Sequence, residues 1–151
     1  MDTVYSEYGF TLNLDLGADV QTTGWTEPEP SEAQGLASFV YGGVISSLVW
    51  SPSESRTPLA LLASSYNALR AAQPTLTFES ISDGEIIVSG QTGAFGGFKA
   101  LDSGGATLGG GLIGAWNCAN DTAYRMTLTG ADATVVQLRF DRLLENFTCP
   151  F

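Results

Sequence analysis

The segment that decides the fold is residues 107–149, with the sequence TLGGGLIGAWNCANDTAYRMTLTGADATVVQLRFDRLLENFTC. Its first half predicts two strands, Thr107–Asn117 and Ala123–Thr129, separated by a short polar turn. Strands joined by a short turn run antiparallel, because a parallel crossover needs a much longer connection. The segment therefore predicts an antiparallel sheet.

The second half of this segment predicts an amphipathic helix that begins at Asp132 or Thr134. Apolar residues recur there every three or four positions, which places them on one face of a helix. The residues expected on this buried stripe are Val135, Val136, Arg139, Phe140, Leu143, Leu144 and Phe147. The stem of Arg139 is expected to lie along the margin of the stripe.

The two cysteines of the chain flank this strand and helix: Cys118 closes the strand before the turn, and Cys149 follows the helix. We expect a Cys118–Cys149 disulfide, with two buried free thiols as the alternative. The bond would close a loop of about thirty residues and contribute roughly 3–4 kcal/mol in the chain-entropy treatment. Disulfides persist outside the cytoplasm, so the expected location is extracytoplasmic: periplasmic, cell-surface or secreted. Because Met1 and Asp2 open onto no basic or long apolar region, we also expect that a signal or anchor segment has been removed.

Period-two alternation and turn residues predict further strands toward the N-terminus. They are expected at Tyr8–Leu16, Leu36–Tyr41, Val44–Trp50, Thr75–Ser82, Glu85–Gly90 and Ala94–Leu101. Hairpin turns are expected at Gly42-Gly43, at Asp83-Gly84 and at Asp102–Gly105. The uncharged run 33–53 is long enough to cross a membrane, but the glycine pair in its middle favours a hairpin. Residues 22–31 are expected to form an acidic exposed loop.

A first helix is expected to begin at Thr57, with Thr57 as its N-cap and Pro58 at its first position. Its apolar face is formed by residues spaced three or four apart, namely Leu59, Leu62, Tyr66 and Leu69, and Pro74 closes it. Together these elements predict one α+β domain over residues 1–151: an antiparallel sheet of about six strands flanked by two amphipathic helices, an α/β/α sandwich.

The charge of the chain excludes several classes of function. Six basic residues face sixteen acidic ones, which gives a net charge of −10, and no Lys or Arg precedes Arg56. Nucleic acid and anionic lipid both require clustered basic side chains, so neither is an expected partner. The excess of acidic residues has two explanations: it keeps the protein soluble, or it forms a surface that binds cations or a basic partner. The candidate residues for such a surface are Glu27, Glu29 and Glu32.

The chemistry of most catalytic and cofactor sites is missing from the sequence. The chain contains no histidine and only two cysteines, so the common zinc, copper and haem ligands and the base of a serine hydrolase are absent. Lys99 could act as a base only toward Ser103 or Ser89, and a solvent-facing lysine is the preferred interpretation. The glycine-rich run Gly93–Lys99 lacks the Gly-Lys-Ser/Thr ending of a phosphate loop. No cofactor is expected.

Acidic residues leave two functional alternatives open. Asn13, Asp15 and Asp19 are candidate ligands for Ca²⁺, which prefers carboxylate and carbonyl oxygens, although no EF-hand spacing is present. A calcium-dependent surface module is therefore one alternative. A hydrolase that uses two carboxylates is the other, with Asp15, Asp19, Glu79 and Glu85 as the residues to draw from.

Aromatic residues allow a further choice between a ligand groove and core packing. They are Trp25, Trp50, Trp116, Tyr41 and Phe95. Packing in the core is the preferred interpretation, because large aromatic side chains dominate the cores of small domains.

The layout resembles the PsbP-like family, which is named for an extrinsic subunit of photosystem II and includes small bacterial and archaeal lipoproteins. The resemblance rests on the opening strand Tyr8–Leu12, on Gly24-Trp25 after it, and on the helices Thr57–Ala72 and Phe140–Phe147, the latter with its Leu143-Leu144 pair. It implies an antiparallel sheet between helices and a non-catalytic role that assists a membrane-bound assembly. No functional residue carries over, since the photosynthetic members are associated with basic and histidine positions and this chain has one lysine and no histidine.

These observations lead to one functional expectation. The chain is expected to be a non-catalytic, extracytoplasmic binding or assembly domain, from a secreted protein or from the soluble part of a membrane-tethered lipoprotein. The expected partner is a protein at or near a membrane, and no membrane span is expected in the chain itself.

Overall fold

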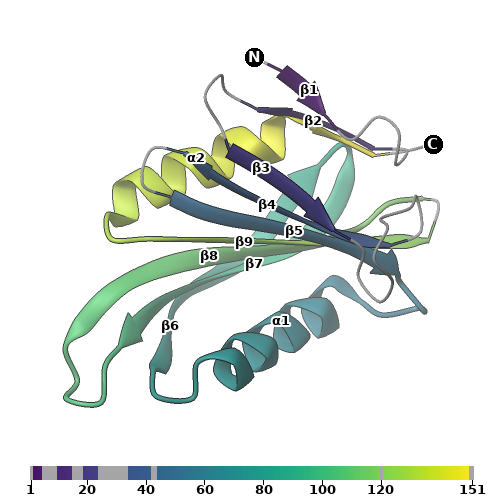
Figure 1. The fold of residues 1–151 in the computed structure, drawn as a ribbon. Coiled ribbons are helices and arrows are strands. Elements are labelled where there is room, and N and C mark those ends of the chain that lie inside the picture. The colour runs from purple at the N-terminus through teal and green to yellow at the C-terminus, as the bar shows by residue number, and fades with distance from the viewer. Residues whose placement is uncertain are drawn as a thin grey trace.

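The computed structural model describes residues 2–4, 10–14, 19–23, 34–41, 44–119 and 121–149. Within these ranges the chain forms three layers, with a helix on each face of an antiparallel sheet (Figure 1). Helix α1 (Pro58–Ala72) covers one face and α2 (Ala133–Glu145) covers the other. The expected α+β class, with two amphipathic helices flanking an antiparallel sheet, is confirmed.

The main sheet formed by the described residues has seven strands, where about six were expected. Their order is β3-β4-β5-β9-β8-β7-β6, and every neighbouring pair is antiparallel. Along the chain they are β3 (Asp19–Thr23), β4 (Gly35–Tyr41), β5 (Val44–Pro52), β6 (Thr77–Val88), β7 (Gln91–Leu101), β8 (Thr107–Asn117) and β9 (Thr122–Gly130). The sheet includes both strands predicted from residues 107–149.

Strand β3 is the additional one, and its last two residues lie in the segment expected to be an acidic loop. Its sequence, DVQTT, has little of the apolar alternation that predicts a strand. It forms by backbone pairing with β4, where Asp19 lies opposite Val40 and Thr23 opposite Leu36. Backbone hydrogen bonds need no particular side chain, so a polar segment can extend a sheet edge without a sequence signal.

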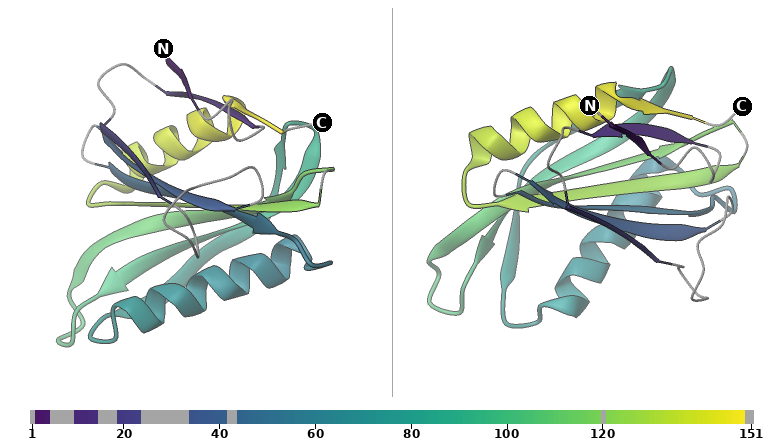
Figure 2. Two further views of the ribbon diagram at one scale, coloured as in Figure 1. Left: turned by 45° about the vertical axis from the view of Figure 1, so that its right-hand side comes forward. Right: turned by 45° about the horizontal axis from the view of Figure 1, so that its top comes forward.

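A smaller sheet of three strands, counted over the same described ranges, lies on the α2 side of the main sheet (Figure 2). It contains β1 (Asp2–Val4), β2 (Thr11–Leu14) and β10 (Phe147–Thr148), in the order β1-β2-β10. The strand expected at Tyr8–Leu16 is thus β2, but it belongs to this sheet and not to the main one. Phe147 also differs from expectation, because it lies in β10, opposite Leu12, and not on the helix.

The hairpin before β7 has its turn at a different place from the one expected. Strand β6 continues through Asp83-Gly84, which pair with Gly96 and Phe95, and the chain turns at Ser89-Gly90. Both turn residues have positive φ, 51° and 79°, which matches the two-residue hairpin loop that suits the twist of the strands. The sequence offers two turn signals, and β6 continues through the first of them as one strand, with a register shift between Ser80 and Ser82.

Helix α1 begins where the sequence places it. The Thr57 side chain accepts a hydrogen bond from the Ala60 N–H at 3.2 Å, and Pro58 is the first helical residue. Leu61 and Leu62 are buried against the sheet, and Tyr66 and Leu69 pack at the margin of that cluster. Leu59 was expected on this face but is 71% exposed, because its turn lies beside a groove next to β6.

Helix α2 is capped by Asp132, whose carboxylate accepts hydrogen bonds from the N–H groups of Thr134 at 2.9 Å and Val135 at 3.3 Å. The helix begins at Ala133, so Asp132 and not Thr134 is the cap. The expected stripe is confirmed in its centre, where Val136, Phe140, Leu143 and Leu144 are buried. Val135 and Arg139 lie half-buried at its margin.

Glycines in the sheet allow the two helices to approach closely. A Cβ atom on Gly114 of β8 would lie 2.9 Å from Cζ of Phe140 on α2, and one on Gly96 of β7 would lie 2.7 Å from the Tyr66 hydroxyl of α1. Real Cβ atoms do not come so close to a neighbour. The glycine-rich stretch therefore belongs to the sheet, and its lack of side chains lets the helices pack closely against it.

Between the main sheet, α2 and the small sheet lies an aromatic cluster. Phe10, Trp50, Trp116, Tyr124 and Phe147 contact one another with ring centroids 4.9–6.0 Å apart. All five side chains are at most 2% exposed, so the two sheets share one core.

Tyr124 gives this core a sensitivity to alkaline pH. Its hydroxyl is buried and has no hydrogen-bond partner among the residues that the structure describes, and burial raises the pKa of the phenol well above its ordinary 10.0. The folded state therefore keeps its proton at pH values where the unfolded state has lost it, so stability falls as pH rises above 10. The loss is at most about 1.4 kcal/mol per pH unit.

We expect Tyr124→Phe to leave the free energy of unfolding at neutral pH unchanged or raised by up to about 1 kcal/mol, because an unsatisfied buried hydroxyl is removed. The loss of stability above pH 10 should also diminish. Urea denaturation at neutral and alkaline pH measures both effects. The control is Tyr66→Phe, which removes a hydroxyl that donates to the Gly97 carbonyl at 3.4 Å and should lower stability at neutral pH. A clear loss of stability in Tyr124→Phe at neutral pH would contradict this account.

Candidate functional site

The predicted disulfide is present: Cys118, just after β8, is bonded to Cys149, just after β10, with their Cα atoms 5.7 Å apart. The Cys118 side chain is 4% exposed and belongs to the core. The N–H of Cys149 donates to the Ser89 hydroxyl at 3.0 Å, which also ties this end of the chain to the turn of the β6–β7 hairpin. The bond therefore fastens β10 and the end of α2 to the main sheet.

The candidate calcium ligands and the candidate acidic surface fall largely outside the described residues. Asp15, Glu27, Glu29 and Glu32 lie outside them, and Asn13 and Asp19 are placed only as backbone positions of β2 and β3. No group of three or more His, Cys, Asp or Glu side chains that could hold a metal ion occurs in the described ranges. Calcium binding at Asn13, Asp15 and Asp19 stays a prediction.

The candidate carboxylates Glu79 and Glu85 are not brought together. They are six positions apart on one extended strand, which corresponds to about 20 Å. Glu79 lies 3.6 Å from the ammonium of Lys99, and both side chains are about half exposed. Lys99 is therefore exposed on the surface, which is the interpretation preferred from the sequence. The group beside its ammonium is the Glu79 carboxylate.

The tryptophans that the structure describes belong to the core and not to a groove. Trp50 and Trp116 are fully buried, which confirms the preferred interpretation for both. Phe95 is partly buried and packs against the same core. The side chains of Trp25 and Tyr41 lie outside the described set.

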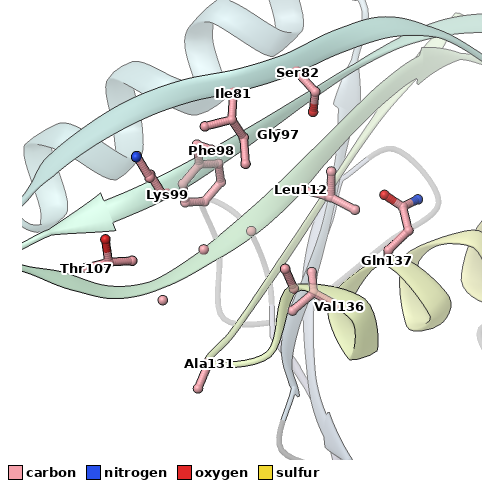
Figure 3. A pocket seen from close by; sticks show the side chains of 14 residues that line it. Ile81, Ser82, Gly97, Phe98, Lys99, Thr107, Leu112, Ala131, Val136 and Gln137 are labelled. Carbon is pink, nitrogen blue, oxygen red and sulfur yellow. The ribbon is translucent and has the colours of Figure 1, made fainter.

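One groove, of about 220 Å³, lies between the N-terminal turn of α2 and the outer part of the sheet (Figure 3). Glycines 109–111 of β8 form part of its lining, together with Ile81, Phe98, Leu112 and Val136. Its longest polar side chains already have partners, because Lys99 pairs with Glu79 and Gln137 donates to Asp141 at 2.9 Å. The volume is below the roughly 300–1,000 Å³ of usual ligand pockets, so this groove offers room for little more than a small apolar group.

A larger groove, of about 520 Å³, lies on the opposite face, between the first turn of α1 and the β6–β7 hairpin. We call it the acidic groove; it is lined by Thr57, Pro58, Leu59, Leu62, Asp83, Gly84, Glu85 and residues 92–95. Asp83 and Glu85 are two positions apart on β6, so their side chains leave the same face of the strand. The acidic groove therefore combines two carboxylates with an apolar lining and the exposed Leu59.

The acidic groove is not predicted from the sequence, because Asp83 is expected in a turn and Leu59 in the core. Both assignments separate the groups that the fold brings together. The signal that could have found the site is Ser89-Gly90, a second two-residue turn motif that extends the strand and gives Asp83 and Glu85 a common face.

Arg125 is another residue that the sequence did not single out. It lies on β9 facing α1, is 8% exposed, and its Nη1 lies 3.4 Å from the Ser64 hydroxyl. Burial, with a smaller contribution from the positive charge of Arg56, lowers the pKa of Arg125 from its ordinary value. A single arginine in an alternating strand has the pattern of a solvent-facing position, so its burial could not be predicted from the sequence.

None of the helices in the described part of the chain has both the length and the apolar character needed to cross a membrane.

Comparison with known proteins gives a structural likeness and no likeness of sequence. No family model matches the chain, and no curated protein sequence matches it. Among solved structures it is similar to the cyanobacterial PsbP (CyanoP) from Synechocystis sp. PCC 6803, with a TM-score of 0.71 and 14% sequence identity. The likeness covers 96% of this chain and 89% of that one. This overlap shows that the chain has a PsbP-like fold.

Proposed function

We propose that this chain is a non-catalytic binding or assembly domain that acts outside the cytoplasm, in a secreted or membrane-tethered protein, on a protein partner at or near a membrane. One observation carries the proposal: the Cys118–Cys149 disulfide joins a core strand to the end of the chain's last helix and strand. A bond in that position supports folding in an oxidising compartment, where disulfides persist.

The distribution of polar groups supports a role in binding. The chain has no histidine, and its candidate carboxylates Glu79 and Glu85 are held apart on one strand. The acidic groove is open and lined by apolar and acidic side chains, a composition suited to contact with another protein. The likeness in fold to a cyanobacterial PsbP supports the same assignment by analogy.

The test is capture of the partner in place, followed by reconstitution. The full-length protein, expressed in its own host, is cross-linked in intact cells and its partners are identified by mass spectrometry. We expect one protein from the membrane or its surface to be enriched, and a complex of fixed stoichiometry to form again from the purified components. Recovery of the same background as for an unrelated exported protein would contradict the proposal.

A further inference from the structure

We propose that the outer edge of β6 and the acidic groove together form a docking site for an extended basic segment of a partner protein. The segment adds to the main sheet as a further strand beside β6. This inference rests on the proposed function and specifies the chemistry of its partner. It is carried by an open strand edge, by the placement of two carboxylates and by a groove that no Lys or Arg lines among the described residues.

Strand β6 is the last strand at its end of the main sheet. It is 12 residues long and pairs with β7, and within the described ranges no strand pairs with its other edge. An edge strand presents alternate N–H and C=O groups that a further chain can use, and strand addition is a common mode of peptide recognition. Proteins usually shorten or cover such an edge, whereas this one is long and exposed.

Beyond the register shift, the two faces of β6 have different environments. Ile86 and Val88 point into the core beneath α2, and Val88 is fully buried. Asp83, Glu85 and Ile87 alternate with them and therefore lie on the α1 face. Ile87 is 74% exposed. The strand is thus anchored on one side and offers two carboxylates and an isoleucine on the other.

The charges of this region favour a basic partner. No Lys or Arg lines the acidic groove among the residues that the structure describes. Arg56, next to the groove in sequence, directs its guanidinium to the carbonyls of Ser53 and Pro52, both at 3.0 Å. A net charge of −10 also attracts basic segments over longer distances.

A second copy of the chain is a poor occupant of this edge. Edge-to-edge pairing of two β6 strands would bring their carboxylates close to one another, and like charges opposite each other on neighbouring strands are destabilising. A partner with Lys or Arg at two alternate positions would instead place its cations opposite Asp83 and Glu85. An apolar residue two positions farther on would reach Ile87.

The probe for this site is a fluorescein-labelled peptide of about nine residues, in which arginine alternates with threonine and valine. Binding is measured by fluorescence anisotropy at low ionic strength. We expect the double variant Asp83→Asn with Glu85→Gln to raise Kd about tenfold relative to the wild-type chain, because two cross-strand charge pairs are lost. The matched control is Asp141→Asn with Glu145→Gln, which removes the same charge from α2 on the opposite face and should raise Kd by no more than about twofold, because only the long-range attraction is reduced.

Three outcomes, two of the binding measurement and one of sedimentation, would overturn the inference. The first is an equal loss of affinity in both double variants, which would mean that only net charge attracts the peptide. The second concerns two peptides that keep the charges but carry N-methyl groups at alternate residues, one at the arginines and the other at the threonines and valines, so that one of them lacks the N–H donors that face β6. We expect that peptide to bind at least tenfold more weakly, and binding of both as tight as that of the unmodified peptide would exclude strand addition. Sedimentation that shows a dimer whose formation blocks the peptide would assign the edge to a second copy and would also overturn it.

A cross-linking experiment separates failure of this inference from failure of the proposed function. A photoreactive amino acid replaces Ile87 beside the acidic groove or, in a second protein, Leu138, which is 64% exposed on α2. Capture of one defined partner from position 87 and not from position 138 supports the docking site. Capture from position 138 alone would overturn the site while leaving the proposed function intact, and capture from neither position would count against both.

Discussion

Removal of the disulfide, by Cys118→Ser together with Cys149→Ser, is expected to lower the free energy of unfolding by about 3–4 kcal/mol. The two cysteines are 31 positions apart, and the bond between them restricts the unfolded chain over that whole loop. A loss of this size is a large part of the 5–15 kcal/mol that stabilises an ordinary domain.

The effect should also be visible in the core, because the bond fixes β10 beside the aromatic cluster. Phe147 of β10 lies with its ring centroid 5.5 Å from that of Phe10, 5.0 Å from Trp116 and 4.9 Å from Tyr124. When the bond is absent, β10 is fastened by its short pairing with β2 and by the packing of Phe147. We therefore expect the near-ultraviolet circular dichroism of the aromatic residues to weaken before the main sheet unfolds.

Urea denaturation of the oxidised protein and of the double variant measures this prediction. The variant Cys118→Ala with Cys149→Ala is the control for the polarity of serine, since Cys118 is buried, and it should lose nearly as much stability. Thiol alkylation of the wild-type protein, before and after denaturation, should find no free thiol. Stability within about 0.5 kcal/mol of wild type in both variants would contradict the structural role given to the bond.

Phe140→Ala is expected to lower the free energy of unfolding by about 3–5 kcal/mol, the usual loss for a phenylalanine removed from a packed core. Phe140 is 1% exposed and is the central aromatic contact between α2 and the sheet. Leu138→Ala on the same helix is the matched control, because Leu138 is 64% exposed and should change stability by less than about 0.5 kcal/mol. Chemical denaturation measures both, and equal small losses would contradict the packing described for α2.

Gly114 provides a second test of the same contact. In the wild-type chain Gly114→Ala should be destabilising, because the new Cβ would lie 2.9 Å from Cζ of Phe140. In the Phe140→Ala protein the same substitution fills part of the space left by the ring and should be neutral or stabilising. The double-mutant cycle is expected to give a coupling energy of about 1 kcal/mol or more, and purely additive effects would mean that the ring and the glycine do not touch.

Much of the fold was accessible from local sequence patterns, because these patterns report interactions within or next to a single element. The helix starts could be predicted from Thr57 and Asp132, whose side chains cap backbone N–H groups, and from Pro58, which has no N–H to satisfy. In the structure these residues have those roles. The stripe around Phe140 predicts a buried helix face through its spacing alone. The disulfide was predicted because Cys118 closes an expected strand and Cys149 lies just past the expected C-terminal helix.

Other features could not be predicted, because they depend on which of several equivalent local signals pairs with a distant strand. Asp83-Gly84 and Ser89-Gly90 are both acceptable hairpin turns, and pairing along the whole length of β7 selects the second. The polar strand β3 exists because β4 offers it an open edge. Leu59 keeps the spacing of its apolar neighbours but lies over a groove, so it is exposed.

The sequence by itself determined the α+β class, the two amphipathic helices, the disulfide partners and the exclusion of histidine-based chemistry, since these follow from residue type and short-range spacing. Only the tertiary structure decided the seven-strand order, the separate small sheet and the acidic groove. Each of these depends on contacts between segments far apart in the chain, whose pairing is set by the packing of the whole core. Asp83 and Glu85 lie beside α1 because of that packing, and no local sequence pattern predicts this position.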